Sequence, residues 1–232
     1  MLPRLNSTIW RYMQLPSLLS ILQQKQLFFV AISHVRDPYD GDLPKAVKNR
    51  YWDWAGFSPQ DYESPPGSFG DHVENVIRKS TCINCWHVNS VESAAMWSLY
   101  SSHGVAIKST VKRLINAVGS TREEVRIGAV QYVDFHAPKM KEAERCLFEV
   151  VVKRKSFDHE KELRAITFDL DVMNGKKRGK FVDVDVSELI ETVYISPIVE
   201  DWIKDIVGQE LKVHGLPDVS VKHSPLYSKD LK

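Results

Sequence analysis

Residues 8–32 read TIWRYMQLPSLLSILQQKQLFFVAI, and the spacing of their apolar side chains changes twice. Residues 8–13 alternate, which predicts a strand with Arg11 and Tyr12 on opposite faces. Pro16 then stands near a helix start, and the leucines after it recur at helical spacing. LFFVAI is a short apolar run typical of a buried strand. The stretch therefore predicts a strand, a helix and a second strand in immediate succession.

The rest of the chain continues this mixture of helices and strands. Strands are predicted at residues 80–88, 104–109, 125–135, 163–170, 181–186, 193–196 and 218–224, and helices at 89–104, 111–119, 138–157, 188–193 and 199–211. Thr110 and Ser187 are the expected caps of the helices that follow them. Because no regular βαβ rhythm appears, we predict an α+β fold with a mixed, mostly antiparallel sheet flanked by helices. Residues 56–70 read as an irregular excursion too short for a linker, so one domain over 1–232 is expected.

The composition gives no electrostatic reason to expect a nucleic-acid or membrane partner. Thirty-one Lys and Arg residues face thirty Asp and Glu residues, for a formal charge of +1. The longest apolar runs are far too short to cross a bilayer, and the N-terminal residues lack the features of a secretion signal. Three cysteines do not suggest an oxidising compartment. We therefore expect a cytoplasmic protein, and its sequence specifies no oligomeric state.

The common metal, nucleotide and hydrolase motifs are missing from the sequence. Cys82 and Cys85 form half of a zinc site, but Cys146 stands alone and no second pair has suitable spacing. The pair lies on a predicted strand, whereas redox pairs begin helices, so small buried side chains are the alternative interpretation. No phosphate-binding glycine loop, nucleophile elbow or His-Glu-x-x-His occurs. We predict no metal site and no required cofactor.

Residues 157–164, FDHEKELR, place many ionisable groups directly before an apolar strand. If the extended chain begins at or before Glu160, then Glu160, Glu162 and Arg164 share one face at intervals of about 6.6 Å. Two carboxylates on one face repel when they are desolvated, while Arg164 would keep its neighbour ionised. That arrangement suits a general base or a carboxylate that stabilises an oxocarbenium ion. The alternative is a charged strand entry with ordinary ion pairs.

Two further motifs are candidate ligand contacts. Trp97 and Tyr100 lie three residues apart on one face of a predicted helix. They either pack in the core or form an aromatic wall for a planar ligand. Asp37 belongs to RDPYDG at residues 36–41, which is either a capped turn or a functional loop. Each motif thus has a structural and a functional interpretation.

Four motifs in order, and the end of the chain, resemble the bacterial domain of unknown function 2971 family (DUF2971). They are IWRYM at 9–13, DPYDG at 37–41, SAAMWSLYSSHGVAI at 93–107 and KRKSFDHEKELRA at 153–165. The endings at 184–197 and 218–227 are also similar. Arg36 stands where the family's loop usually has Asn. The resemblance implies a bacterial cytoplasmic protein and no established activity.

A looser resemblance is to ADP-ribosyltransferases, which have an early Arg or His, aromatic residues and a late Glu-x-Glu. It implies that Arg11 holds NAD, that Tyr12 or Trp97 stacks on nicotinamide, and that Glu162 is catalytic with Glu160 orienting the acceptor. The first hypothesis is accordingly an ADP-ribosyltransferase or NAD glycohydrolase with NAD as substrate. The second is a non-enzymatic binding or regulatory module of a bacterial defence system, such as phage defence, or of a stress system. Only the enzyme requires Arg11, Asp37, Trp97, Tyr100, Glu160, Glu162 and Arg164 to converge on one pocket.

Overall fold

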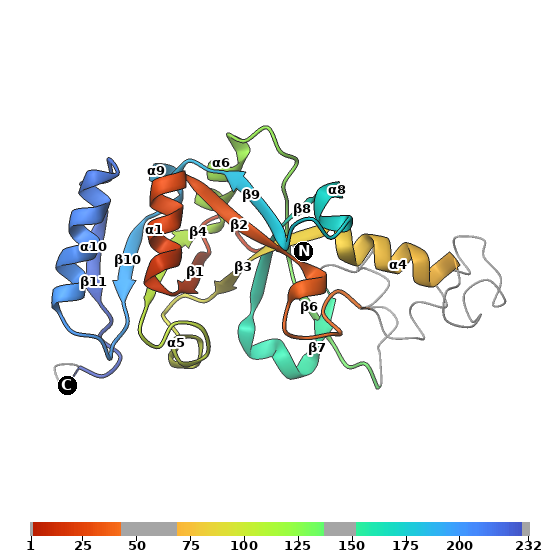
Figure 1. The fold of residues 1–232 in the computed structure, drawn as a ribbon. Coiled ribbons are helices and arrows are strands. Elements are labelled where there is room, and N and C mark those ends of the chain that lie inside the picture. Colours follow the sequence, from red (N-terminus) through yellow and green to blue (C-terminus); the bar gives the residue numbers. More distant parts are fainter. Residues whose placement is uncertain (1, 43–68, 137–151, 229–232) are drawn as a thin grey trace. The chain divides into compact units, whose positions relative to one another are not determined.

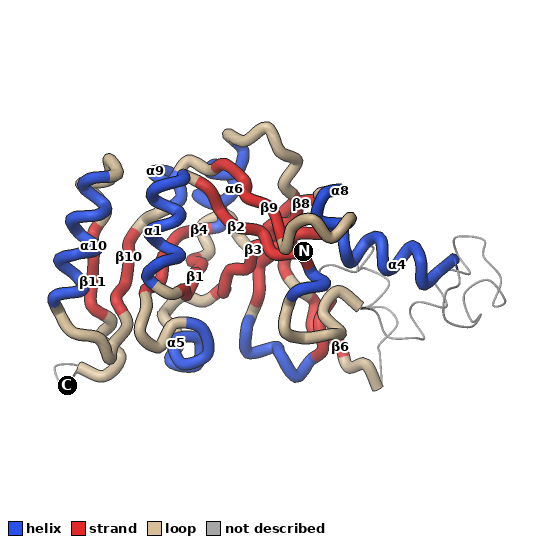
Figure 2. Tube along the Cα trace, viewed as in Figure 1, coloured by secondary structure: helices blue, strands red, loops and turns tan. Residues whose placement is uncertain are grey.

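The computed structural model describes residues 2–42, 69–136 and 152–228 (Figure 1). Helices and strands are interspersed along the chain (Figure 2), and most strand pairs are antiparallel. The predicted α+β class is therefore confirmed. The residues group into two compact units: unit 1 comprises 1–27, 85–125 and 181–232, and unit 2 comprises 28–84 and 126–180. One domain spanning residues 1–232 stays a prediction.

The chain passes between the units four times, once between Val125 and Arg126 and three times within a strand. The three strands are β2 (Gln26–Ala31), β3 (Thr81–Val88) and β9 (Gly179–Asp183). The remaining elements each belong to one unit and are described with it.

Unit 1 is a sheet with helices packed against it. Its elements are β1 (Thr8–Met13), α1 (Leu15–Gln24), α5 (Ala94–Tyr100), β4 (Val105–Thr110), α6 (Val111–Gly119), α9 (Val186–Leu189), β10 (Thr192–Ile195), α10 (Trp202–Val213) and β11 (Ser220–His223). The strand order is β11-β10-β4-β1, followed by the last residues of β3. Among the described strand pairs of this order, β10 and β11 are parallel and the others are antiparallel. The register of β1 and β4 sets Tyr12 opposite Ala106, which brings the aromatic side chains of β1 over β4.

The helices of unit 1 bury one face each, as their apolar spacing predicts. Leu18, Ile21 and Leu22 are the buried residues of α1, which begins with Pro16 in its first turn. Thr110 caps α6 by accepting a hydrogen bond from the Arg113 backbone N–H at 3.2 Å, so the predicted cap is confirmed. Gly104 lets the chain turn from α5 into β4 at very close quarters, since a Cβ there would lie 2.2 Å from the Met13 carbonyl oxygen.

In unit 2, strand β2 pairs with β3, and β8 pairs with both β3 and β5. Its elements are η1 (Ile32–His34), α4 (Phe69–Ser80), β5 (Arg126–Ala129), β6 (Gln131–Val133), β7 (Val152–Arg154), η3 (Lys155–Glu160), β8 (Glu162–Phe168) and α8 (Leu170–Met173). β8 pairs antiparallel with β5, which sets Arg164 opposite Gly128. β6 and β7 form a separate parallel pair. The first six residues of β8 are all buried, and this strand carries the charged residues of interest.

Several local predictions differ from the structure. The expected strand at 125–135 is two strands, because the chain changes partner at Val130 from β8 to β7. The expected helix at 138–157 is wrong for residues 152–157, which form β7 and the start of η3. Its residues 138–151, Cys146 among them, lie outside the described residues, as do 56–68 of the expected excursion. Asp185, not Ser187, caps α9, because its carboxylate accepts from two backbone N–H groups.

Candidate functional site

A buried group of five charged side chains lies in unit 2, and we call it the ion cluster. It consists of Asp40, Lys153, Glu160, Glu162 and Arg164. Asp40 lies in the loop after η1, Lys153 on β7, Glu160 at the end of η3, and the other two on β8. Their exposed fractions run from 0% for Arg164 to 7% for the two glutamates and the lysine. Charges at this depth are tolerated only when they pair with one another.

Arg164 joins the strand to the loop 124 residues earlier in the chain. Its Nε and one terminal nitrogen donate to the two carboxylate oxygens of Glu162, at 3.1 and 2.9 Å. The guanidinium also contacts both oxygens of Asp40, at 2.8 and 2.9 Å. This forked geometry matches a planar cation to two carboxylates. Arg164 therefore fixes the position of Glu162 through both carboxylate oxygens.

Lys153 is the second cation of the cluster. Its Nζ donates to Glu160 and lies 3.3 Å from Glu162 Oε2 and 3.4 Å from Asp40 Oδ2. Burial by itself lowers the pKa of Lys153, but the charges of Glu162, Asp40 and Glu160 outweigh it and raise that pKa above its ordinary value. Lys153 is therefore positively charged at neutral pH, and it ties Glu160 to the rest of the cluster.

The alignment predicted for Glu160, Glu162 and Arg164 is correct only in part. Glu162 and Arg164 share a face of β8, but the strand begins at Glu162. Glu160 ends η3, and Lys161 after it adopts a left-handed conformation with φ of 41°. That turn, and not period-two alternation, directs Glu160 toward Lys153. The two glutamates thus meet around a shared lysine.

The predicted loop of Asp37 is held by a residue next to the ion cluster, Arg154, which follows Lys153 in the chain. Asp37 is buried and pairs with Arg154 of β7 at 2.8 Å. It also accepts from the Tyr39 backbone N–H at 3.1 Å, so the capped turn is present as well. The Arg154 guanidinium lies over the rings of Tyr39 and Phe157, at 4.8 and 5.3 Å from their centroids. The loop is therefore held to β7 and η3 through Asp37 and Tyr39.

Tyr132 of β6 supports the start of β8. Its hydroxyl oxygen accepts a hydrogen bond from the Glu162 backbone N–H at 2.8 Å. Burial raises the pKa of Tyr132, and the nearby Glu162 and Glu160 charges raise it further. The phenol is accordingly neutral at physiological pH, and it positions the backbone of Glu162 without adding charge.

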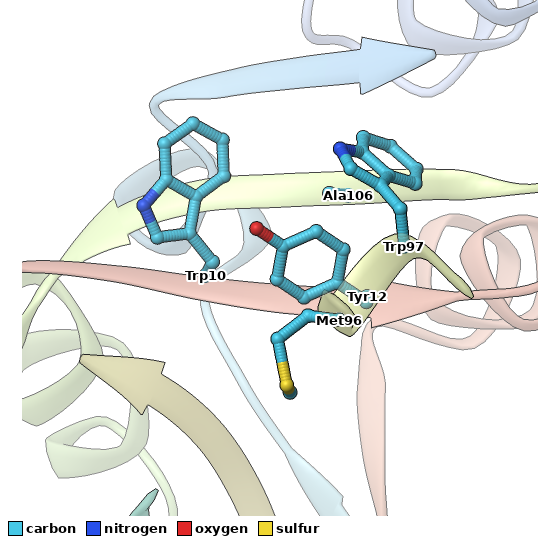
Figure 3. Packing of buried hydrophobic residues seen from close by; sticks show 5 residues of the cluster. All are labelled: Trp10, Tyr12, Met96, Trp97 and Ala106. Atoms are coloured by element: carbon cyan, nitrogen blue, oxygen red, sulfur yellow. The ribbon is translucent and has the colours of Figure 1, made fainter. Parts of the chain in front are cut away.

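The aromatic candidates Tyr12 and Trp97 lie in unit 1, within a packed core cluster (Figure 3). Figure 3 shows the rings of Trp10, Tyr12 and Trp97 together with the Met96 side chain. The Tyr12 and Trp97 rings meet edge to face, with centroids 5.1 Å apart. Trp97 is 2% exposed and Tyr12 8%. Their burial supports core packing, the first of the two interpretations of this motif.

Polar contacts fix the edges of this aromatic cluster. The Tyr12 hydroxyl accepts from the Ser93 backbone N–H at 2.8 Å, and burial raises the pKa of Tyr12. Glu92 accepts from the Trp97 indole N–H at 2.8 Å and from the Ser224 hydroxyl at 2.5 Å. Glu92 therefore links α5 to the segment that follows β11.

The other two candidates of unit 1 lie apart from these rings. Arg11 points to the opposite face of β1 from Tyr12, and its guanidinium donates to the Cys85 carbonyl at 2.7 Å. Tyr100 is 45% exposed at the end of α5. Trp97 and Tyr100 therefore do not form one buried wall, although Tyr100 keeps an exposed ring.

The structure thus gathers the candidates into two sets. Asp37, Glu160, Glu162 and Arg164 lie in unit 2, and Arg11, Tyr12, Trp97 and Tyr100 lie in unit 1. Their convergence on one pocket stays a prediction. The charged region also contains four residues that were not predicted as members of it, namely Asp40, Lys153, Arg154 and Tyr132. Asp40 lay within a quoted motif, and Lys153 and Arg154 would have stood out if residues 152–154 had been assigned to a strand.

The cysteine pair singled out in the sequence lies on β3. Within 2–42, 69–136 and 152–228, no three His, Cys, Asp or Glu side chains are placed to hold a metal ion. Cys82 and Cys85 lie on opposite faces of β3 because they are three residues apart on the strand. Burial raises the pKa of the Cys82 thiol to about 11. No helix in the described part of the chain is long and apolar enough to cross a membrane.

Comparison with known proteins finds a weak structural likeness only. No protein-family model matches the chain, and no curated protein does. Among solved structures, Thermus sp. 2.9 DarT in complex with NAD+ has a TM-score of 0.42 and 12% identity, over 97% of this chain and 98% of that chain. DarT with carba-NAD+ gives 0.41 and 12%, over 96% and 97%. DarT with ADP-ribosylated ssDNA gives 0.41 and 12%, over 94% of each. At such values the likeness carries no inference about activity.

Proposed function

We propose that this chain breaks the N-glycosidic bond of NAD and transfers ADP-ribose, with Glu162 as the catalytic carboxylate. The observation that carries the proposal is the environment of Glu162. This side chain is 7% exposed, Arg164 donates hydrogen bonds to both of its carboxylate oxygens, and the Lys153 Nζ lies 3.3 Å away. A carboxylate held in one position beside two cations in a region of low dielectric suits the stabilisation of a developing oxocarbenium ion.

The reaction needs few groups. The bond between the ribose carbon and the nicotinamide nitrogen breaks, its electron pair leaves with neutral nicotinamide, and the positive charge on the ribose is stabilised by Glu162. An acceptor hydroxyl or amine, or water, then bonds to that carbon and loses its proton. Glu160, joined to Glu162 through Lys153, is the proposed residue for orienting the acceptor. The NAD contact that the resemblance implies for Arg11 stays a prediction.

A non-enzymatic binding or regulatory module is the second candidate. The observation that favours it is the mutual pairing of the ion cluster, in which Arg164 and Lys153 each contact more than one carboxylate. Tyr12 and Trp97 are also core residues. Under this reading the cluster anchors the loop of Asp40 to β8, and the module serves a bacterial defence or stress system. Membership of the DUF2971 family is proposed with either candidate, on the motifs alone.

The deciding experiment offers NAD labelled separately in its nicotinamide and adenylate halves. Acceptors are water alone, single-stranded DNA, double-stranded DNA and total cell protein. We expect nicotinamide release by the wild type and a loss of at least a hundredfold in Glu162→Gln, since the proposed charge is removed without a change of shape. Glu200→Gln, the same change at an exposed position, is the matched control and should retain full activity.

The outcomes separate the two candidates. Absence of nicotinamide release and of label transfer by the folded wild type, with every acceptor, overturns the enzyme. Equal turnover by the wild type and a folded Glu162→Gln variant overturns the role of Glu162. If Glu162→Gln proves unfolded by circular dichroism, the wild-type assay alone still decides between enzyme and module.

A further inference from the structure

Helix α10 carries an exposed apolar stripe on the side away from the core of unit 1. The stripe consists of Trp202, Ile206, Gln209 and Val213. At 100° per residue these four positions fall within an arc of about 60°. Trp202 is 57% exposed, Ile206 39% and Val213 78%. Large apolar side chains gathered on one exposed helix face mark an interaction surface more than isolated ones do.

The buried residues of α10 lie on the opposite side. Val207 and Leu211 are 0% and 1% exposed, and the helix lies beside β11 (Figure 1). They are about 140–180° around the helix from Trp202, at 100° per residue. Val207 and Leu211 supply the buried face of α10, which contacts β11 and α1, and the stripe is a second, exposed apolar face.

Two opposite charges flank the stripe on the same side. Asp205 lies in the first turn of α10 and Lys212 in the last turn, and both are exposed. Both lie about 60–80° from Trp202 around the helix, on one flank. When two copies of such a helix pack antiparallel about a two-fold axis, the same flank of each copy meets. Asp205 then faces Lys212 of the second copy, and Lys212 faces its Asp205.

We propose that the α10 stripe is a homodimer interface whose occupant is α10 of a second copy of this chain, antiparallel. Setting Asp205 level with Lys212 of the second copy fixes the register. With a rise of 1.5 Å per residue, Val213 of the second copy then lies between Trp202 and Ile206. This is the knob-into-hole relation of paired helices.

The middle of the stripe fits the same register. The two Gln209 side chains come within about 1.5 Å of the same height, on either side of the two-fold axis. A single polar residue in an apolar seam specifies register at some cost in affinity. On the other flank Glu210 lies 3.6 Å from His214 of its own helix.

The charge pattern selects a second copy over an unrelated protein, because the surface complements itself under one two-fold rotation. The stripe is one helix of 12 residues, so the interface is small and the dimer is a dissociating one. It involves only residues of unit 1 and is independent of the proposed NAD chemistry.

The test is analytical ultracentrifugation of the full chain from low micromolar to near-millimolar concentration. We expect a monomer–dimer equilibrium for the wild type. Asp205→Lys or Lys212→Asp alone sets like charges opposite each other twice, so each should weaken dimerisation at least tenfold. An equimolar mixture of the two variants should form a heterodimer at least as tight as the wild-type dimer. Lys204→Asp, an exposed change about 160° from the seam, is the matched control and should dimerise as the wild type does.

Each of the following results would overturn the proposal. They are a wild type that stays monomeric at every concentration, a dimer that neither single charge reversal weakens, and a variant mixture that forms no heterodimer. Circular dichroism establishes that each variant is folded. Trp202→Ser supplies an uncharged second probe, and an undiminished dimer in that variant also contradicts the proposed seam.

Discussion

Removal of the Arg164 cation is the sharpest test of the ion cluster. We expect Arg164→Met to lower the free energy of unfolding by about 3–5 kcal/mol, the usual cost of leaving buried charges without their partner. The structure supports the upper part of this range. Arg164 is 0% exposed, it donates hydrogen bonds to two carboxylates, and only Lys153 among the other cluster residues is a cation. In this variant the Asp40 and Glu162 side chains lose their guanidinium partner. They are only 4% and 7% exposed, so water cannot replace it.

Urea unfolding followed by far-UV circular dichroism measures the loss. Arg122→Met, the same change at an exposed position, is the matched control and should alter the free energy of unfolding by less than about 0.5 kcal/mol. Adding Glu162→Gln and Asp40→Asn to Arg164→Met removes the abandoned charges, so the triple variant should regain most of the lost stability. A loss below about 1 kcal/mol for Arg164→Met, or a triple variant less stable than the single one, refutes the reasoning.

Three further predictions concern local packing and ionisation. Gly104→Ala should lower the free energy of unfolding by about 1–3 kcal/mol, because its Cβ would lie 2.2 Å from the Met13 carbonyl oxygen. The control is Gly119→Ala, whose Cβ meets nothing within 4 Å. Equal melting temperatures for the two variants would contradict the close approach at Gly104. Gly208→Ala should stabilise α10 by about 0.5–1 kcal/mol, since a Cβ there meets open space and alanine favours the helix, and a lowered melting temperature would count against it. Burial raises the pKa of the Cys82 thiol from 9.0 to about 11, so its contribution to stability is complete below pH 9 and is lost as the pH rises to 11. Urea unfolding at pH 8 and pH 11 should show that Cys82→Ala removes about 2 kcal/mol of this decline, and identical pH profiles for variant and wild type would exclude it.

The proposed chemistry and the stability of unit 2 depend on the same side chains. Glu162 is fixed by Arg164 and Lys153, and Arg164 also anchors the loop of Asp40. A variant that loses NAD turnover must therefore be compared at equal folded fraction before its loss is assigned to catalysis. Glu160→Gln is a second variant for this comparison, because Glu160 contacts Lys153 but belongs to η3 and not to β8.

The sequence alone determined the local elements around which the protein is built. Alternation in residues 8–13 predicted β1, the leucine spacing after Pro16 predicted α1, and the Thr110 side chain predicted the start of α6; the structure has all three. These signals involve residues a few positions apart, whose side-chain directions follow from strand and helix geometry. The pairing of Glu162 with Arg164 was accessible for the same reason, since two residues of separation on a strand place both on one face.

The tertiary structure decided which charges meet. Asp40 reaches Arg164 across 124 residues of sequence, and Lys153 became a partner only because residues 152–154 form a strand and not a helix. Glu160 joins them through the left-handed turn at Lys161, which period-two alternation does not predict. Burial of Trp97 likewise depends on Tyr12 and Trp10 arriving from β1. Pairing of buried charges is a property of position in space, because the cost of desolvating each ion is offset only by the partners that the folded chain brings to it.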